Sequence, residues 1–227
     1  MNNPTELFDI VLKKAKLKQD IYARSVEAIE LLKKVSNEIV TDFKSKLPID
    51  ENRITFDFKD KSNFEFEIKF AGDVLIFMMH TNIFEFSRNH EIMKTPYIKD
   101  DNSRSYCGII NIYNFLADSF KYNRENDIGY LIGRIFINNE NHYYIEGKKE
   151  IGMMYNNFSN NILDEKAARE ILEKAILYTS NFDLLTPPYE EVKEVTVYEM
   201  QSNLDSMRLK TGKRLGFKFQ ADIDNLK

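Results

Sequence analysis

The sequence has few of the residues that stabilise secreted, membrane-spanning or zinc-binding proteins. Its single cysteine, Cys107, cannot form a disulfide within the chain, which is typical of a protein in the reducing cytoplasm. The three histidines, His80, His90 and His142, stand far apart and lack the spacing of a zinc site. No apolar run approaches the ~20 residues that cross a bilayer. We therefore expect a cytoplasmic protein with no metal, no cofactor and no membrane partner.

Motifs of common enzyme classes are missing as well. There is no Gly-x-Ser-x-Gly, no Walker loop and no dinucleotide fingerprint, and the Thr-Gly-Lys at 211–213 lacks the upstream glycine of a phosphate-binding loop. The net charge of −4 argues against a surface built throughout for nucleic acid, although not against a local basic patch. These absences favour a non-enzymatic protein.

The composition that remains is that of an ordinary globular domain. Hydrophobic residues make up 43% and charged residues 30% of the 227 residues. A chain of this length buries roughly 70% of its unfolded surface. We expect one structural unit in two parts, a long helical region at 1–48 and a single α+β domain at 49–227. The abundance of Asn, Lys and Ile and the absence of Trp fit an AT-rich bacterial genome.

Residues 54–79 predict a three-stranded antiparallel meander. In 54–58 and 64–70, apolar and polar residues alternate with the period of a half-buried strand. Turn-forming residues lie between these runs at 60–63. The third run, 74–79, is apolar throughout, as expected of a strand covered on both faces.

The first 48 residues predict a long helix. Asn3 can cap it, Pro4 suits the first helical position, and Glu6 completes a capping box. Apolar residues then recur near helical spacing, without Gly or Pro until Pro48. The helix either breaks near residues 19–20 and packs wholly on its own sheet, or continues and buries a stripe against a partner. The interface candidates for the second alternative are Leu32, Val35 and Ile39.

Further elements complete the predicted fold. Apolar spacing predicts a helix over 105–120, a hairpin over 130–146 and a helix over 164–182, while 88–103 reads as a long loop. Residues 215–219 alternate and could close the sheet. The sequence therefore predicts an α+β fold, with an antiparallel sheet of about five to seven strands packed with helices from the N- and C-terminal parts of the chain.

Three polar residues on the predicted meander resemble a catalytic layout. Asp57 lies on the first strand and Glu67 and Lys69 on the second, all opposite the phenylalanines. An Asp on one strand with Glu-x-Lys on the next resembles metal-dependent nucleases of the restriction-endonuclease type. In those, the carboxylates would hold Mg²⁺ and the lysine would assist the water or the phosphate. Alternating charges also keep an exposed strand face solvated, and we expect this plainer role here.

Charge is segregated near the C-terminus. Residues 183–199 carry five acidic side chains and one lysine, whereas 205–218 carry five basic side chains and one aspartate. The basic residues are Arg208, Lys210, Lys213, Arg214 and Lys218. They could bind a nucleic-acid backbone, with Phe217 and Phe219 stacking on bases. Pairing with the preceding acidic segment, within the chain or across a dimer, explains both segments together and is the interpretation we favour.

These features predict a protein-interaction or assembly subunit of a cytoplasmic complex. It would act through the long N-terminal helix and the charged C-terminal region, as a homo-oligomer or with a partner protein. The alternative is a protein that acts on nucleic acid, either as a binder through 208–218 or as a metal-dependent nuclease with Asp57, Glu67 and Lys69.

Overall fold

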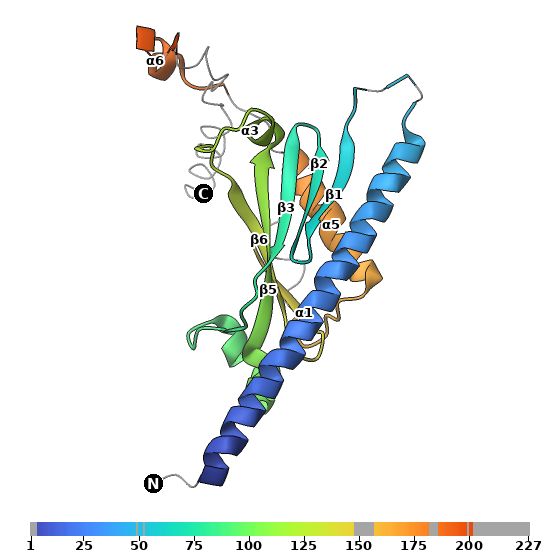
Figure 1. Cartoon of the computed structure of the whole chain (residues 1–227), viewed down its shortest axis with the longest axis vertical. Coiled ribbons are helices and arrows are strands. Elements are labelled where there is room, and N and C mark those ends of the chain that lie inside the picture. The colour runs from blue at the N-terminus through green and yellow to red at the C-terminus, as the bar shows by residue number, and fades with distance from the viewer. Residues whose placement is uncertain are drawn as a thin grey trace.

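The computed structural model describes residues 4–48, 50–51, 53–147, 157–181, 186–198 and 200–201 of the chain. Its centre is a seven-stranded sheet in which the strands follow the order β1-β2-β3-β5-β6-β7 and β4 pairs with β5. All of these pairings are antiparallel. Helices from the N- and C-terminal parts of the chain pack on the sheet (Figure 1). The predicted α+β fold is confirmed.

The predicted meander forms one side of the sheet. It consists of β1 (Phe56–Ser62), β2 (Glu65–Phe70) and β3 (Asp73–Met79). Alternate residues of β2 are buried, and the ring of Phe66 stacks on that of Phe77 in β3 with centroids 4.6 Å apart. The β2–β3 turn holds Ala71 and Gly72 at φ values of 45° and 87°, the left-handed conformation that tight hairpin turns need.

The predicted helix over 105–120 is wrong for most of its length. Residues Tyr106–Leu116 form β5, which pairs with β3, with β4 (Phe84–Glu85) and with β6 (Tyr130–Ile137). Both faces of β5 are covered, since Ile110 and Ile112 join the main core and Cys107 and Ile109 join a second cluster. A strand buried on both sides carries apolar residues without strict alternation, and its pattern then matches a helix by coincidence.

The predicted hairpin and C-terminal helix are confirmed. Strand β6 turns into β7 (Tyr143–Gly147). Helix α5 (Glu165–Ser180) begins at Asp164, whose side chain accepts a hydrogen bond from the backbone N–H of Ala167 at 2.7 Å. The main core lies between the sheet and two helices. It contains alternate apolar side chains of the sheet, buried residues of α5 and one face of α1 (Pro4–Lys46).

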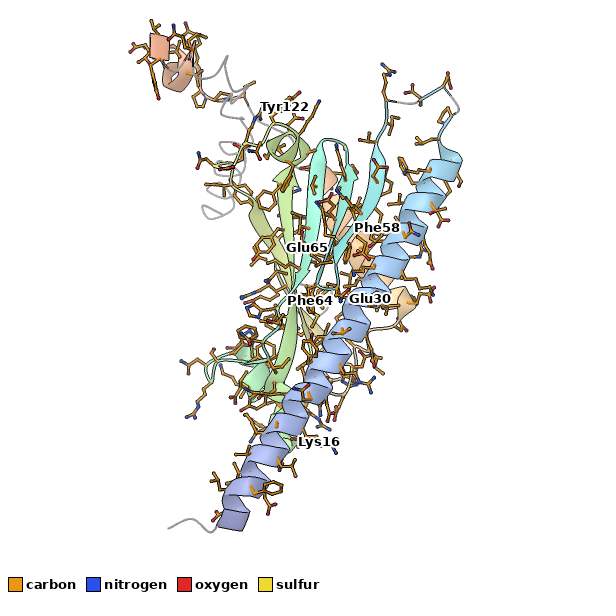
Figure 2. The ribbon with its side chains drawn as sticks, viewed as in Figure 1. Lys16, Glu30, Phe58, Phe64, Glu65 and Tyr122 are labelled. Carbon is orange, nitrogen blue, oxygen red and sulfur yellow. The ribbon has the colours of Figure 1, made fainter. Side chains whose placement is uncertain are left out.

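Helix α1 is continuous, so of the two alternatives left open by the sequence, the break near residues 19–20 does not occur. Two contacts fix its position on the sheet. The first is a close approach to β5 at Gly108, where any Cβ would lie 1.9 Å from the Ser25 hydroxyl oxygen. The second is Lys33, whose ammonium group donates to the Ser62 carbonyl at 2.8 Å and pairs with Asp60 at 3.0 Å and Glu30 at 2.9 Å. Glu30 lies beside the β1–β2 turn at Phe64 (Figure 2).

Short helical turns replace the long loop expected at 88–103. They are η1 (Glu91–Lys94), α2 (Pro96–Asp100) and η2 (Asn102–Ser105), while α3 (Ala117–Lys121) follows β5. They cover one end of the second sheet face through a cluster rich in aromatic residues. The apolar members of that cluster are Phe86, Ile92, Ile98, Cys107, Ile109, Phe136 and Phe158. The predicted strand at 215–219 lies outside the described residues.

Candidate interaction surface

The N-terminal part of α1 continues past the end of the sheet (Figure 1). Lys14 lies 3.6 Å above the ring of Tyr106, the first residue of β5, so residues before Lys14 have no strand beneath them. Five large apolar side chains in this part, between Leu7 and Leu12, are 54% to 63% exposed. They are Leu7, Phe8, Ile10, Val11 and Leu12. We call residues 6–18 of α1 the α1 overhang.

Part of the apolar surface of the overhang prolongs the helix face that packs on the sheet. Leu7 and Val11 lead, at steps of three or four residues, through Lys14 and Lys18 to the buried Ile21. The same face contacts the core farther along the helix and is left open at the overhang. An apolar helix face of this kind normally packs against another element.

The overhang also carries a concentrated positive charge. Lys13, Lys14, Lys16 and Lys18 follow the apolar residues within six positions, and Lys16 projects from the lower part of α1 in Figure 2. None of the four forms a salt bridge with another described residue. Lysines that form no intramolecular salt bridge can pair with acidic groups of another chain.

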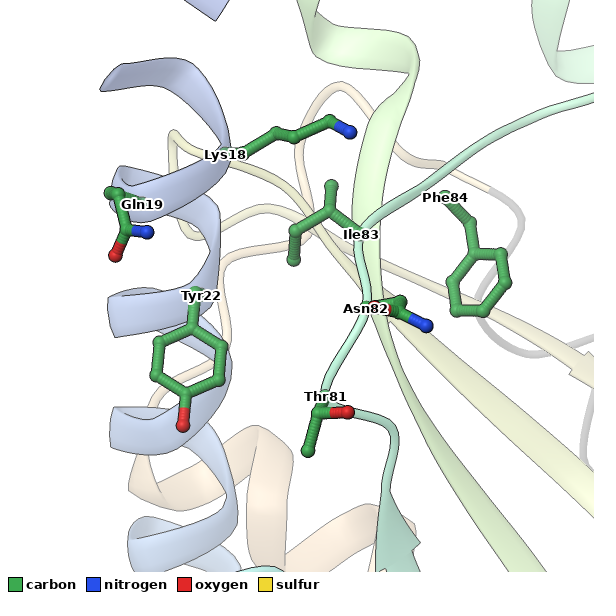
Figure 3. A pocket seen from close by; sticks show the side chains of 7 residues that line it. All are labelled: Lys18, Gln19, Tyr22, Thr81, Asn82, Ile83 and Phe84. Carbon is green, nitrogen blue, oxygen red and sulfur yellow. The ribbon is translucent and has the colours of Figure 1, made fainter. Parts of the chain in front are cut away.

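A pocket of about 460 Å³ adjoins the overhang (Figure 3). One wall comes from α1 and the other from the connection between β3 and β4, where the side chain of Ile83 points into the space between them. The lining residues are Lys18, Gln19, Tyr22, Thr81, Asn82, Ile83 and Phe84. The pocket combines apolar side chains with the ammonium group of Lys18 and the amides of Gln19 and Asn82. The apolar part suits an aromatic ring, and the polar groups suit a hydroxyl group on that ring or an acidic residue beside it.

The sequence-based interface residues lie elsewhere on α1. Leu32 and Val35 are fully buried in the core of this chain, and Ile39 is partly buried against it. Leu32 and Val35 therefore offer no surface to a partner in this structure, and Ile39 is only partly accessible. The exposed stripe of the helix is the one near its N-terminus, which the sequence analysis included in the helix but did not single out.

The residues of the nuclease-like set engage lysines. Asp57 pairs with Lys44 of α1 at 2.6 Å, and Glu67 pairs with Lys61 across the hairpin at 3.0 Å. Asp57 lies directly opposite Lys69 in the ladder. Strand β1 is at the edge of the sheet. The structure thus brings the three residues onto neighbouring strands, but each carboxylate already has a cation beside it, as on a solvated strand face.

The basic residues predicted to bind a partner lie outside the described part of the chain. These are Arg208, Lys210, Lys213, Arg214 and Lys218. The acidic segment before them is partly described, and it includes α6 (Tyr189–Val192). Its apolar side chains are strongly exposed, with Tyr189 at 75% and Tyr198 at 79%.

The histidines and the cysteine have local structural roles. His80 and His90 each accept a hydrogen bond from a backbone N–H two residues later, and His142 contacts the Phe158 carbonyl at 3.1 Å. Burial raises the pKa of the Cys107 thiol well above its usual value. Among the described residues, no three His, Cys, Asp or Glu side chains gather closely enough to hold a metal ion.

A polar network joins α2 to the β6–β7 turn. The Tyr97 hydroxyl donates to Glu140 at 2.6 Å and accepts from the Asn138 amide at 2.8 Å, while Arg104 donates to Glu140 at 2.9 Å. Burial and the hydrogen bond to Glu140 raise the pKa of Tyr97. The donors and acceptors of this network satisfy one another, so its geometry is that of a structural clasp.

None of the described helices combines the length and apolar character that a membrane crossing requires. No family model, no curated protein and no solved structure matches this chain.

Proposed function

We propose that this chain is a non-enzymatic protein-interaction or assembly subunit that acts through the α1 overhang. The observation that carries the proposal is the set of five exposed apolar residues from Leu7 to Leu12, in the part of α1 before Lys14 that has no strand beneath it. Contiguous exposed apolar surface on a soluble protein marks an interaction site, and leaving it bare favours aggregation. The reducing cytoplasm, where a lone thiol stays free, is the compartment that we propose.

The nucleic-acid alternative has no comparable support among the described residues. Asp57 and Glu67 are paired with lysines at the edge of the sheet, and the basic stretch at 208–218 lies outside the described residues. A partner that covers apolar residues beside lysines accounts for the overhang, whereas a phosphate backbone would leave Leu7 to Leu12 uncovered.

The test is a photo-cross-linking amino acid placed at Val11 in cells, with Asn37 as the matched position. Both residues are exposed on α1, but only Val11 belongs to the overhang. We expect protein adducts from position 11 and none from position 37. Leu7→Ser with Leu12→Ser should reduce the adducts without lowering the melting temperature, because exposed side chains contribute little to folding. The proposal fails if position 11 gives no adduct and the purified protein is monomeric at every concentration.

A further inference from the structure

The chain carries a second exposed surface whose charge is opposite to that of the α1 overhang. We call residues 189–198 the acidic segment. They contain Glu190, Glu191 and Glu194 against a single Lys193, whereas the overhang has four lysines against Glu6 and Asp9. Each surface also exposes large apolar side chains, which in the acidic segment are Tyr189, Val192, Val195, Val197 and Tyr198. The two surfaces are therefore complementary both in charge and in apolar character.

Tyr189, the first residue of the acidic segment, cannot reach the apolar residues 7–12 of its own chain. Ser180, at the end of α5, lines the same pocket as Phe43, near the C-terminal end of α1. From Phe43 to Leu12 the helix extends about 46 Å at its rise per residue. The chain between Ser180 and Tyr189 spans at most about 32 Å even when fully extended. Figure 1 accordingly shows α6 and the N-terminus at opposite ends of the molecule.

We infer that the acidic segment of one copy docks on the α1 overhang of a second copy. The inference rests on the proposed function, because it names the partner of the same surface. Glu194 pairs with an overhang lysine, and Glu190 exchanges its contact with Lys193 at 2.5 Å for another overhang lysine. The valines cover Val11 and its neighbours, and Tyr189 enters the pocket between α1 and the β3–β4 connection. A buried tyrosine surrounded by charged pairs is a common anchor of protein interfaces.

Docking of this kind is directional. The two surfaces, the overhang as head and the acidic segment as tail, are different patches of the chain. After the first contact, one copy therefore keeps a free head and the other keeps a free tail. Further copies can therefore bind at either end, and the assembly grows until it closes into a ring or no more copies bind. Salt weakens the contact, because the ion pairs lie at an exposed rim.

Two variants test the direction of assembly. The head variant is Leu7→Asp with Val11→Asp, and the tail variant is Glu190→Lys with Glu194→Lys. Asn37→Asp on α1 and Glu125→Lys on an exposed turn are the matched charge controls. In light scattering over a concentration series, the average molecular mass of the wild type and of both controls should rise with protein concentration. Each variant alone should associate at least about tenfold more weakly. An equimolar mixture of the two variants should form a dimer and nothing larger, since only one complementary contact remains.

Other results overturn the inference in distinguishable ways. If the tail variant assembles as the wild type does, the overhang pairs with another surface of the second copy. If Lys213→Glu with Arg214→Glu abolishes assembly, the acidic segment acts through the basic stretch and not through the overhang. If the wild type is monomeric while position 11 still cross-links to another protein, the inference fails and the proposed function stands. A monomeric wild type that gives no cross-links would contradict both the inference and the proposed function.

Discussion

At the scale of single residues, Lys33 shows how a buried charge is made tolerable. Its side chain is 7% exposed beneath the β1–β2 turn. Burial alone would lower the pKa of Lys33, but the hydrogen bonds and charges of Glu30 and Asp60 outweigh burial and raise the pKa. The folded state therefore holds this proton more tightly than the unfolded chain does. The resulting stability is complete below the lysine pKa of the unfolded chain and is lost as the pH rises through the higher folded value.

Lys33→Met should lower the free energy of unfolding by about 1–2 kcal/mol at pH 7, because the Ser62 carbonyl loses its donor. The difference from the wild type should shrink above a pH of about 10.5, where the wild-type lysine begins to lose its proton. Urea unfolding at several pH values measures both effects. Lys34→Met is the matched control, since Lys34 is exposed beside Glu165 and should matter less. Equal losses in the two variants would contradict this account.

At the scale of elements, α1 shows what a sequence pattern conveys and what it leaves out. The spacing of apolar residues and the absence of Gly and Pro predicted the helix, and the structure bears this out over Pro4–Lys46. The same spacing placed Leu32 and Val11 on one apolar stripe. Only the sheet, whose end lies near Lys14, makes one of them core and the other surface. Where a partner could bind was therefore not predictable from periodicity alone.

A pair of truncations along α1 separates these two roles. Leu32→Ala should cost about 2–5 kcal/mol of unfolding free energy, because it leaves a cavity between α1 and the sheet. Leu12→Ala should leave the unfolding free energy of the monomer within about 0.5 kcal/mol and weaken only the association. Chemical denaturation at low protein concentration provides the comparison. A large loss in Leu12→Ala would mean that the overhang belongs to the core.

Strand β5 shows the opposite kind of error. Ile109, Ile110 and Ile112 are β-branched residues, which favour strands, but their neighbours also fit the three-to-four residue spacing of a helix. The deciding fact is that separate clusters cover the two faces of the strand, and this is a tertiary property. The first two strands of the meander were predicted because apolar and polar residues alternate in them and turn-forming residues lie between them.

At the scale of the whole molecule, the arrangement of charge matters more than its sum. The net charge of −4 predicts little about association, whereas the overhang and the acidic segment separate opposite charges at the two ends of the fold. The acidic and basic runs near the C-terminus are recognisable from the sequence alone. The lysines of 13–18 were not predicted as a partner of the acidic run, because the two regions are far apart along the chain and only the fold places them at opposite ends.

The burial of Cys107 has a practical consequence for following how the molecule opens. The thiol lies under Phe86 and its aromatic neighbours and is almost completely shielded from solvent. Because only an exposed thiolate attacks a disulfide reagent, the rate of colour release from such a reagent measures how often this cluster opens.

We expect the native protein to react far more slowly than a free cysteine. Phe86→Ala should speed the reaction on the order of tenfold or more, since it removes part of the cover. Immediate reaction of the wild type would contradict the buried position. Because the chain has a single thiol, all of the released chromophore comes from Cys107. The rate of its release therefore measures how often this one face of the sheet opens to solvent.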